Sequence, residues 1–108
     1  TLTSGQVFRW ERDVEGIWRG MTGSRFLRLQ QSADATTLYW EADGANAEAA
    51  VRSFLRLDDL NLATIAEEWS RTDSYFADVW TAHPGVRVLR QEPDECFFSF
   101  LCASVAPI

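Results

Sequence analysis

The spacing of the apolar residues in this chain of 108 residues changes once, near Asp43 and Gly44. Before that point apolar and polar residues alternate, which is the period of a half-buried strand; after it the apolar residues recur every three or four positions, the period of an amphipathic helix. Short connections between strands favour antiparallel neighbours, because parallel strands need long crossovers. Strands that come first and helices that follow predict an α+β domain with an antiparallel sheet flanked by helices.

Four strands and four helices are expected. The strands are predicted over residues 7–11, 16–21, 26–30 and 36–40, and the helices over residues 47–55, 62–69, 76–83 and 95–104. We expect Asn46 to cap the first helix, Asp58-Asp59 to precede the second and Thr72-Asp73 to start the third. Pro93 suits the first turn of the last helix, which Pro107 ends or kinks.

The composition restricts the classes of protein that this chain can belong to. With 46% hydrophobic residues and five tryptophans, the chain can form a core, which argues against intrinsic disorder. No segment has the roughly 20 apolar residues that span a bilayer. The net charge of −6 argues against a free-standing nucleic-acid-binding protein, and sixteen acidic residues favour ion pairs over phosphate contacts for Arg9, Arg87 and Arg90. The absence of lysine excludes a lysine Schiff base within this chain.

No pattern in the chain predicts a metal or cofactor site. Cys96 and Cys102 lie six residues apart in a predicted helix, which separates their Cα atoms by about 9 Å along its axis, too far for a disulfide. They are interpreted as reduced, buried residues of a cytoplasmic protein. His83 lies on an apolar helical stripe and is interpreted as structural. The five tryptophans are expected in the core, and the pairs Asp58-Asp59 and Glu67-Glu68 in caps or on solvated faces.

Two long segments resemble the N-terminal region of the 8-oxoguanine DNA glycosylases. They read TLTSGQVFRW over residues 1–10 and GVRVLRQEPDECFFSFLC over residues 85–102. Residues 16–20, 54–58 and 69–76 keep the order and approximate spacing of the family, so the resemblance covers essentially the whole chain.

The resemblance implies a TATA-binding-protein-like domain over residues 1–108, followed by a helix-hairpin-helix domain that this chain does not contain. It also implies an enzyme that flips a damaged guanine out of duplex DNA and cleaves its glycosidic bond, commonly through a lysine Schiff base that permits strand nicking. The catalytic lysine and aspartate of the family lie in the later domain. We therefore expect this chain to be a piece of a longer protein and to contain no catalytic residue and no cofactor.

The resemblance implies a specific role for one residue of this chain. Gly5 matches the family glycine whose main-chain carbonyl accepts a hydrogen bond from the N7 hydrogen of 8-oxoguanine. Normal guanine has a lone pair at N7, so the same carbonyl would meet repulsion there. Such an unsatisfied pairing costs about 1–3 kcal/mol.

The sequence departs from the family pattern at Val105, Ala106 and Pro107. The family commonly has three asparagines there, in a loop that fills the gap left by the flipped base and contacts the orphaned cytosine. Valine and alanine can act only as an apolar wedge or through main-chain groups. We therefore expect this DNA-contacting loop to distinguish the opposite base less sharply.

The expected partner is double-stranded DNA containing 8-oxoguanine, bound through the intact protein as a monomer and without a membrane. The expected location is the cytoplasm with its nucleoid, or the nucleus in a eukaryote. Two other functions stay open: a glycosylase for alkylated bases, and a non-catalytic interaction domain of the same fold. A later domain with both lysine and aspartate favours the 8-oxoguanine glycosylase. Aspartate alone favours the glycosylase for alkylated bases, and neither residue favours the interaction domain.

Overall fold

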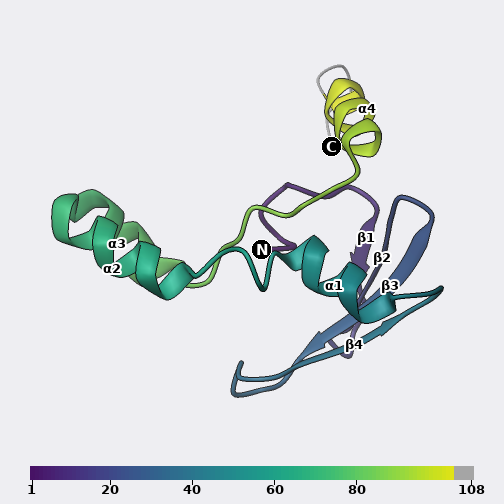
Figure 1. Cartoon of the computed structure of the whole chain (residues 1–108), viewed down its shortest axis with the longest axis horizontal. Helices are drawn as coiled ribbons and strands as arrows, with labels where there is room; N and C mark the ends of the chain where they lie inside the picture. The colour runs from purple at the N-terminus through teal and green to yellow at the C-terminus, as the bar shows by residue number, and fades with distance from the viewer. Residues whose placement is uncertain (104–108) are drawn as a thin grey trace.

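The computed structural model describes residues 1–103, which form a four-stranded antiparallel sheet and four helices (Figure 1). The α+β prediction is confirmed. The strands are β1 (Trp10–Arg12), β2 (Trp18–Thr22), β3 (Arg25–Gln31) and β4 (Leu38–Ala42), and the helices are α1 (Ala47–Leu55), α2 (Leu62–Thr72), α3 (Ser74–Ala82) and α4 (Pro93–Ala103).

Each strand of the sheet pairs with the next one along the chain, in the order β1-β2-β3-β4. Leu27 lies opposite Gly20 and Ala42, and the neighbouring Phe26 lies opposite Met21. Because successive side chains point to opposite faces of a strand, this register places Leu27 on the apolar face and Phe26 on the other. The first strand begins at Trp10 rather than at residue 7. Gln6 bonds to Arg87 and Leu89, and of the residues between it and Trp10, Arg9 accepts a hydrogen bond from the Met21 amide of β2 at 3.2 Å.

Helix α1 covers the apolar face of the sheet and forms the core with it. Leu27 and Val51 are fully buried, and the rings of Trp10 and Phe54 stack with their centroids 5.4 Å apart and their planes 5° from parallel. Leu89, from the extended segment before α4, is buried in the same cluster. The core therefore joins the sheet, the first helix and a residue near the end of the chain.

The predicted helix starts are partly confirmed. Asp73 caps α3 by accepting a hydrogen bond from the Phe76 amide at 3.1 Å, and Pro93 is the first residue of α4. Asn46 occupies the N-cap position of α1 as expected, but its backbone is left-handed at φ 55° and its side chain accepts no cap hydrogen bond. Asp58-Asp59 precede α2 as expected, and the N-cap residue is Asn61, whose side chain accepts from the Thr64 amide.

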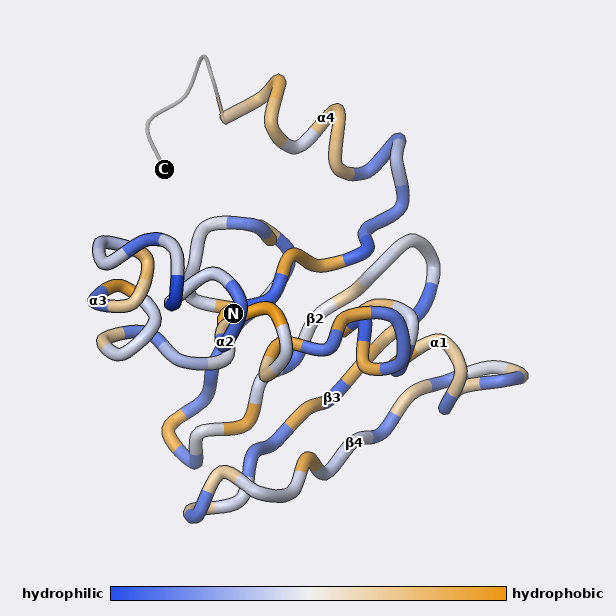
Figure 2. Tube along the Cα trace, turned by 60° about the vertical axis from the view of Figure 1, so that its left-hand side comes forward, coloured by the Kyte–Doolittle hydropathy of each residue, from blue (hydrophilic) through white to orange (hydrophobic). Residues whose placement is uncertain are grey.

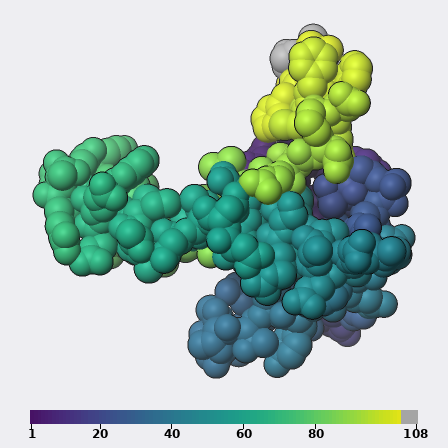
Figure 3. Space-filling view, in the orientation of Figure 1, coloured from purple at the N-terminus to yellow at the C-terminus, as the bar shows by residue number. Residues whose placement is uncertain are grey.

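Two parts of the molecule project from the sheet and α1. Helices α2 and α3 form a hairpin at one side, and α4 stands apart at another (Figures 1 and 3). The radius of gyration is 15.3 Å, whereas a compact chain of this length is expected near 13 Å. Neither α3 nor α4 contains a buried residue, although α4 is apolar along most of its length (Figure 2). None of the described helices is long and apolar enough to cross a membrane.

Several residues predicted to be buried are exposed. Trp40 on the edge strand is 42% exposed and Trp69 on α2 is 55% exposed, so neither side chain belongs to the core. His83 is exposed at the end of α3, and Cys102 is exposed on α4, while Cys96 is half-buried. Helices α2 and α3 do carry apolar stripes, but each helix of this hairpin has only the other one to cover its stripe. Within it, Phe76 packs between Trp69 and Trp80, with ring centroids 5.4 Å and 6.3 Å away.

The register of β3 makes a prediction that two neighbouring substitutions test. Leu27→Ala removes a side chain with no exposed surface, so the free energy of unfolding should fall by about 3 kcal/mol. Phe26→Ala removes a larger side chain that is 41% exposed and should cost about 1 kcal/mol. Urea unfolding followed by circular dichroism measures both. Equal losses, or a larger loss for Phe26→Ala, would mean that the two faces of the sheet are assigned wrongly.

Candidate functional site

The first residues of the chain lie against residues 85–91, and side chains make the connection. We call residues 1–6 and 85–91 together the N-terminal seam. Its outer end is Thr1, whose hydroxyl donates to the Gly85 carbonyl at 3.3 Å and accepts from the Arg87 amide at 3.1 Å. The seam therefore closes the chain on itself without a regular β-ladder.

Gln6 makes the central contacts of the seam. Its Nε2 donates to the Arg87 carbonyl at 2.7 Å, and its Oε1 accepts from the Leu89 amide at 2.9 Å. Its main-chain carbonyl accepts from Nε2 of Gln91 at 2.7 Å. The side-chain amide of Gln6 thus donates to Arg87 and accepts from Leu89, two residues further on, as the main chain of a neighbouring strand would.

Residues 85–91 are fixed to the core from their other side. The Leu89 side chain is buried, and the Arg90 amide donates to the Phe54 carbonyl at 2.9 Å. The guanidinium of Arg87 donates to the carbonyls of Arg56 and Leu60 at 3.1 and 3.2 Å, beyond the end of α1. The segment that holds Gln6 is therefore itself held by the core.

Gly5 lies in the exposed turn between the fixed residues of the seam. Its φ of +77° is a left-handed conformation that residues with a Cβ adopt at a cost of about 1–2 kcal/mol. A Cβ built on Gly5 would meet nothing within 4 Å, so the conformation, and not crowding within the chain, requires glycine. On the preceding side, the amide and hydroxyl of Ser4 both donate to the Thr1 carbonyl, at 3.1 and 2.6 Å. Within residues 1–103, no group donates to the Gly5 carbonyl.

Ion pairs occupy most of the arginines. All ten lie within residues 1–103, and seven of them form an ion pair with a carboxylate. Arg9 pairs with Glu95 at 3.4 Å and Arg90 with Asp59 at 2.6 Å, which confirms the preference for ion pairs at these two positions. At Arg87 the partners are main-chain carbonyls instead. Most of these pairs are at the surface and stabilise the fold by at most about 1 kcal/mol each.

Within residues 1–103, three carboxyl groups have a lowered pKa, and each lowering has a local cause. The Ile17 amide lowers the pKa of Asp13 in the turn between β1 and β2, and the Ser32 hydroxyl lowers the pKa of Asp34 in the turn before β4. The Arg52 guanidinium lowers the pKa of Asp58. These shifts favour the charged carboxylates that hold turns and a surface pair, and they do not indicate general acid catalysis.

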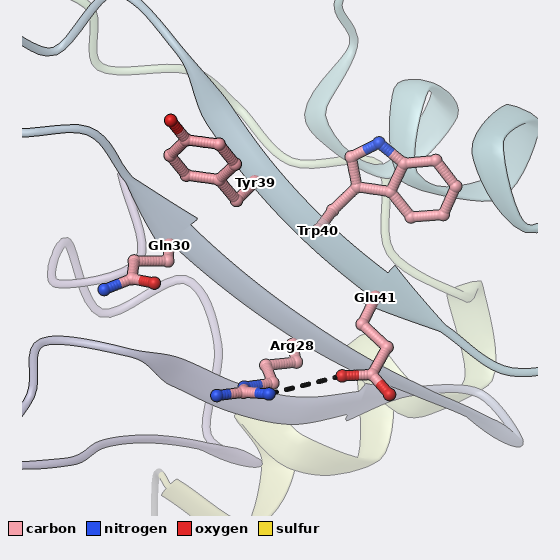
Figure 4. A pocket seen from close by; sticks show the side chains of 5 residues that line it. All are labelled: Arg28, Gln30, Tyr39, Trp40 and Glu41. Atoms are coloured by element: carbon pink, nitrogen blue, oxygen red, sulfur yellow. Dashed lines mark hydrogen bonds and ion pairs between the residues drawn. The ribbon is translucent and has the colours of Figure 1, made fainter.

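A hollow of about 190 Å³ on the sheet is a weaker candidate (Figure 4). Arg28 and Glu41 form an ion pair at 3.4 Å beside Gln30 and Tyr39, whereas Trp40 points away from them. The pair is exposed and follows directly from the register, in which Arg28 lies opposite Glu41. Within residues 1–103, no three histidine, cysteine or acidic side chains gather as a metal site would need.

The structure brings Gly5 together with a residue that the sequence analysis missed. The sequence around Gln6 gives no local signal of its role, because its partners lie more than eighty residues away. The predicted loop residues Val105, Ala106 and Pro107 lie outside the described residues.

The class of protein to which the chain belongs follows from its similarity to a known family. The model of the family described as "8-oxoguanine DNA glycosylase, N-terminal domain" matches residues 1–97, which include Gly5 and both sides of the seam. The chain belongs to this family.

Two relatives support this assignment. An "N-glycosylase/DNA lyase OGG1" of Arabidopsis thaliana is 32% identical to this chain over 108 residues, covering 96% of the chain and 29% of that protein. A solved structure described as "Structure of MBOgg1 in complex with low affinity DNA ligand" superposes with a TM-score of 0.73 and 25% identity, covering 85% of this chain and 31% of the other. The chain therefore spans about a third of the length of these relatives.

Proposed function

We propose that this chain is the lesion-reading part of a monomeric DNA glycosylase that removes 8-oxoguanine from duplex DNA. The observation that carries the proposal is the Gly5 peptide, which lies exposed in a conformation that favours glycine, between two neighbours fixed by hydrogen bonds. The family to which the chain belongs and the DNA-bound neighbour support it.

The Gly5 carbonyl would read the lesion at one atom. 8-Oxoguanine carries a hydrogen on N7 that can donate to this carbonyl, whereas guanine offers a lone pair at the same position. A fixed acceptor opposite a lone pair leaves both groups without a partner, which costs about 1–3 kcal/mol. A site that uses a hydrogen bond to recognise its substrate rejects the analogue that lacks it, because the buried polar groups are then unpaired.

The bond cleavage itself would depend on residues outside this chain. The chain has no lysine to form a Schiff base, and both relatives are about three times longer. Exposed aromatic side chains on α4, including Phe97 and Phe98, support the proposal that a further domain packs there. Beside α4 lies a hollow of about 670 Å³, lined mostly by apolar side chains from residues 7–10 and from α4.

A direct test of the proposed function uses the full-length protein. Duplexes carrying 8-oxoguanine, 7-methylguanine or unmodified guanine are incubated with it, and released bases are measured by mass spectrometry. We expect release of 8-oxoguanine alone. Release of only the alkylated base would favour a glycosylase for alkylated bases, and no release of either would favour an interaction domain; both results would overturn the proposal.

The isolated chain should neither cleave DNA nor bind it tightly. Its net charge is −6 and most of its arginines are paired, so it can form few phosphate contacts. The measurement is a titration of the purified 108-residue chain with a lesion duplex at low salt, followed by a strand-cleavage assay. Lesion-specific cleavage, or submicromolar binding, would show that this part of the protein carries more of the activity than we propose.

Substituting Gly5 should reduce the discrimination between 8-oxoguanine and guanine. In the full-length protein, Gly5→Ala places a Cβ on a residue at φ +77°, so the peptide should rotate and move its carbonyl. We expect the binding preference for the 8-oxoguanine duplex over the guanine duplex to fall by about tenfold or more, as a loss of about 1.4 kcal/mol implies.

The matched control is Gly44→Ala, which has the same kind of backbone conformation at φ +79° but lies between β4 and α1. Its added Cβ would meet the Arg25 guanidinium at 3.1 Å, which donates to the carbonyls of Asp43 and Ala45. Gly44→Ala should therefore lose at least as much stability as Gly5→Ala, and only Gly5→Ala should lose preference. An equal loss of preference in both variants would reduce Gly5 to a structural residue.

A further inference from the structure

We infer that Gln6 is the positioning residue that fixes the direction of the Gly5 carbonyl. This inference rests on the proposed function and goes beyond it, because it assigns the specificity of the site to a side chain as well as to a main-chain group.

The geometry of the peptide bond carries the first step. The Gly5 carbonyl and the Gln6 amide nitrogen belong to one planar unit, so the carbonyl can turn only as that whole plane turns. Its direction depends on the torsions of Gly5 and Gln6. Glycine alone does not restrict them, because it lacks the Cβ that limits other residues.

The contacts of Gln6 supply the missing restriction. Three hydrogen bonds hold it to residues 85–91: two through its side chain, to Arg87 and Leu89, and one through its carbonyl, from Gln91. Nε2 of Gln6 also donates to the Ser4 hydroxyl at 2.8 Å, so the same side chain bonds to the residue before Gly5 as well as to residues 85–91. Leu89 is buried in the core, which makes the far side of these bonds rigid.

An acceptor held in this way loses little conformational freedom when it binds a donor, and this raises both affinity and discrimination. Without Gln6, the Gly5 peptide could rotate to meet guanine as well as 8-oxoguanine through different atoms. The role is one of positioning, since Gln6 uses its side-chain amide for bonds within the chain.

The test is a double-mutant cycle in the full-length protein. Gln6→Met keeps the length of the side chain and removes the hydrogen bonds of its amide, and the readout is the ratio of the affinities for duplexes with 8-oxoguanine and with guanine, as for Gly5→Ala. A general loss of folded protein weakens both affinities and leaves the ratio unchanged. We expect the ratio to fall about tenfold in Gln6→Met and by no further amount when Gly5→Ala already carries the loss, because both changes act on one carbonyl.

Two further variants complete the design. Gln91→Met removes only the bond to the Gln6 carbonyl, so it should lower the ratio less, by about threefold. This variant provides the test if Gln6→Met proves too unstable to purify. Gln30→Met is the control, since Gln30 lies on the outer face of the sheet (Figure 4), and it should leave the ratio unchanged.

The two ideas fail in different ways. If the unmodified protein does not prefer 8-oxoguanine, the proposed function is wrong. If it does prefer the lesion, but Gln6→Met and Gln91→Met keep the full ratio, or if the losses in Gln6→Met and Gly5→Ala add independently, Gln6 does not position the carbonyl.

Discussion

The hydrogen bonds of Gln6 are the contacts on which the arrangement of this molecule most depends. They join residues from opposite ends of the described chain, since Gln6 bonds to Arg87, Leu89 and Gln91. Apolar contacts assist, since Leu2 and Val7 pack against the core cluster on either side of the turn. A flexible N-terminal segment thereby becomes a fixed loop, with a buried anchor at Leu89 and an exposed peptide at Gly5.

This arrangement separates recognition from attraction. A single main-chain acceptor can distinguish two purines that differ at N7, but it contributes little to holding a polyanion. The acidic chain uses its arginines mainly for its own carboxylates and carbonyls, as Arg90 and Arg87 illustrate. Under the proposed function, most of the attraction to DNA would come from residues outside this chain, which spans about a third of the length of its relatives.

Local patterns in the sequence predicted the elements well because their causes are local. The change of period near Asp43 separates sheet from helices, and Asp73 and Pro93 act within a single turn. Burial was predicted less well, since an apolar stripe shows which face of a helix is apolar but not what covers it. Trp69 lies on such a stripe and is nevertheless exposed.

The candidate site was predictable only in part, for the same physical reason. Gly5 could be identified through its family resemblance, and its positive φ supplies a conformational reason for the glycine. The role of Gln6 follows from partners that are distant in the sequence, so no periodicity or capping rule could indicate it. Asn46 shows the converse, because a favourable residue type at a helix start made no cap bond.

Side-chain hydrogen bonds of Thr1 and Gln6 hold residues 1–6 against residues 85–91. Amide hydrogen exchange measured by NMR can test this, because the amides of Arg87 and Leu89 donate to Thr1 and Gln6, while Val88 between them donates to no group within residues 1–103. We expect slow exchange at Arg87 and Leu89 and fast exchange at Val88. Equally fast exchange at all three amides would show that these hydrogen bonds do not hold the two segments together.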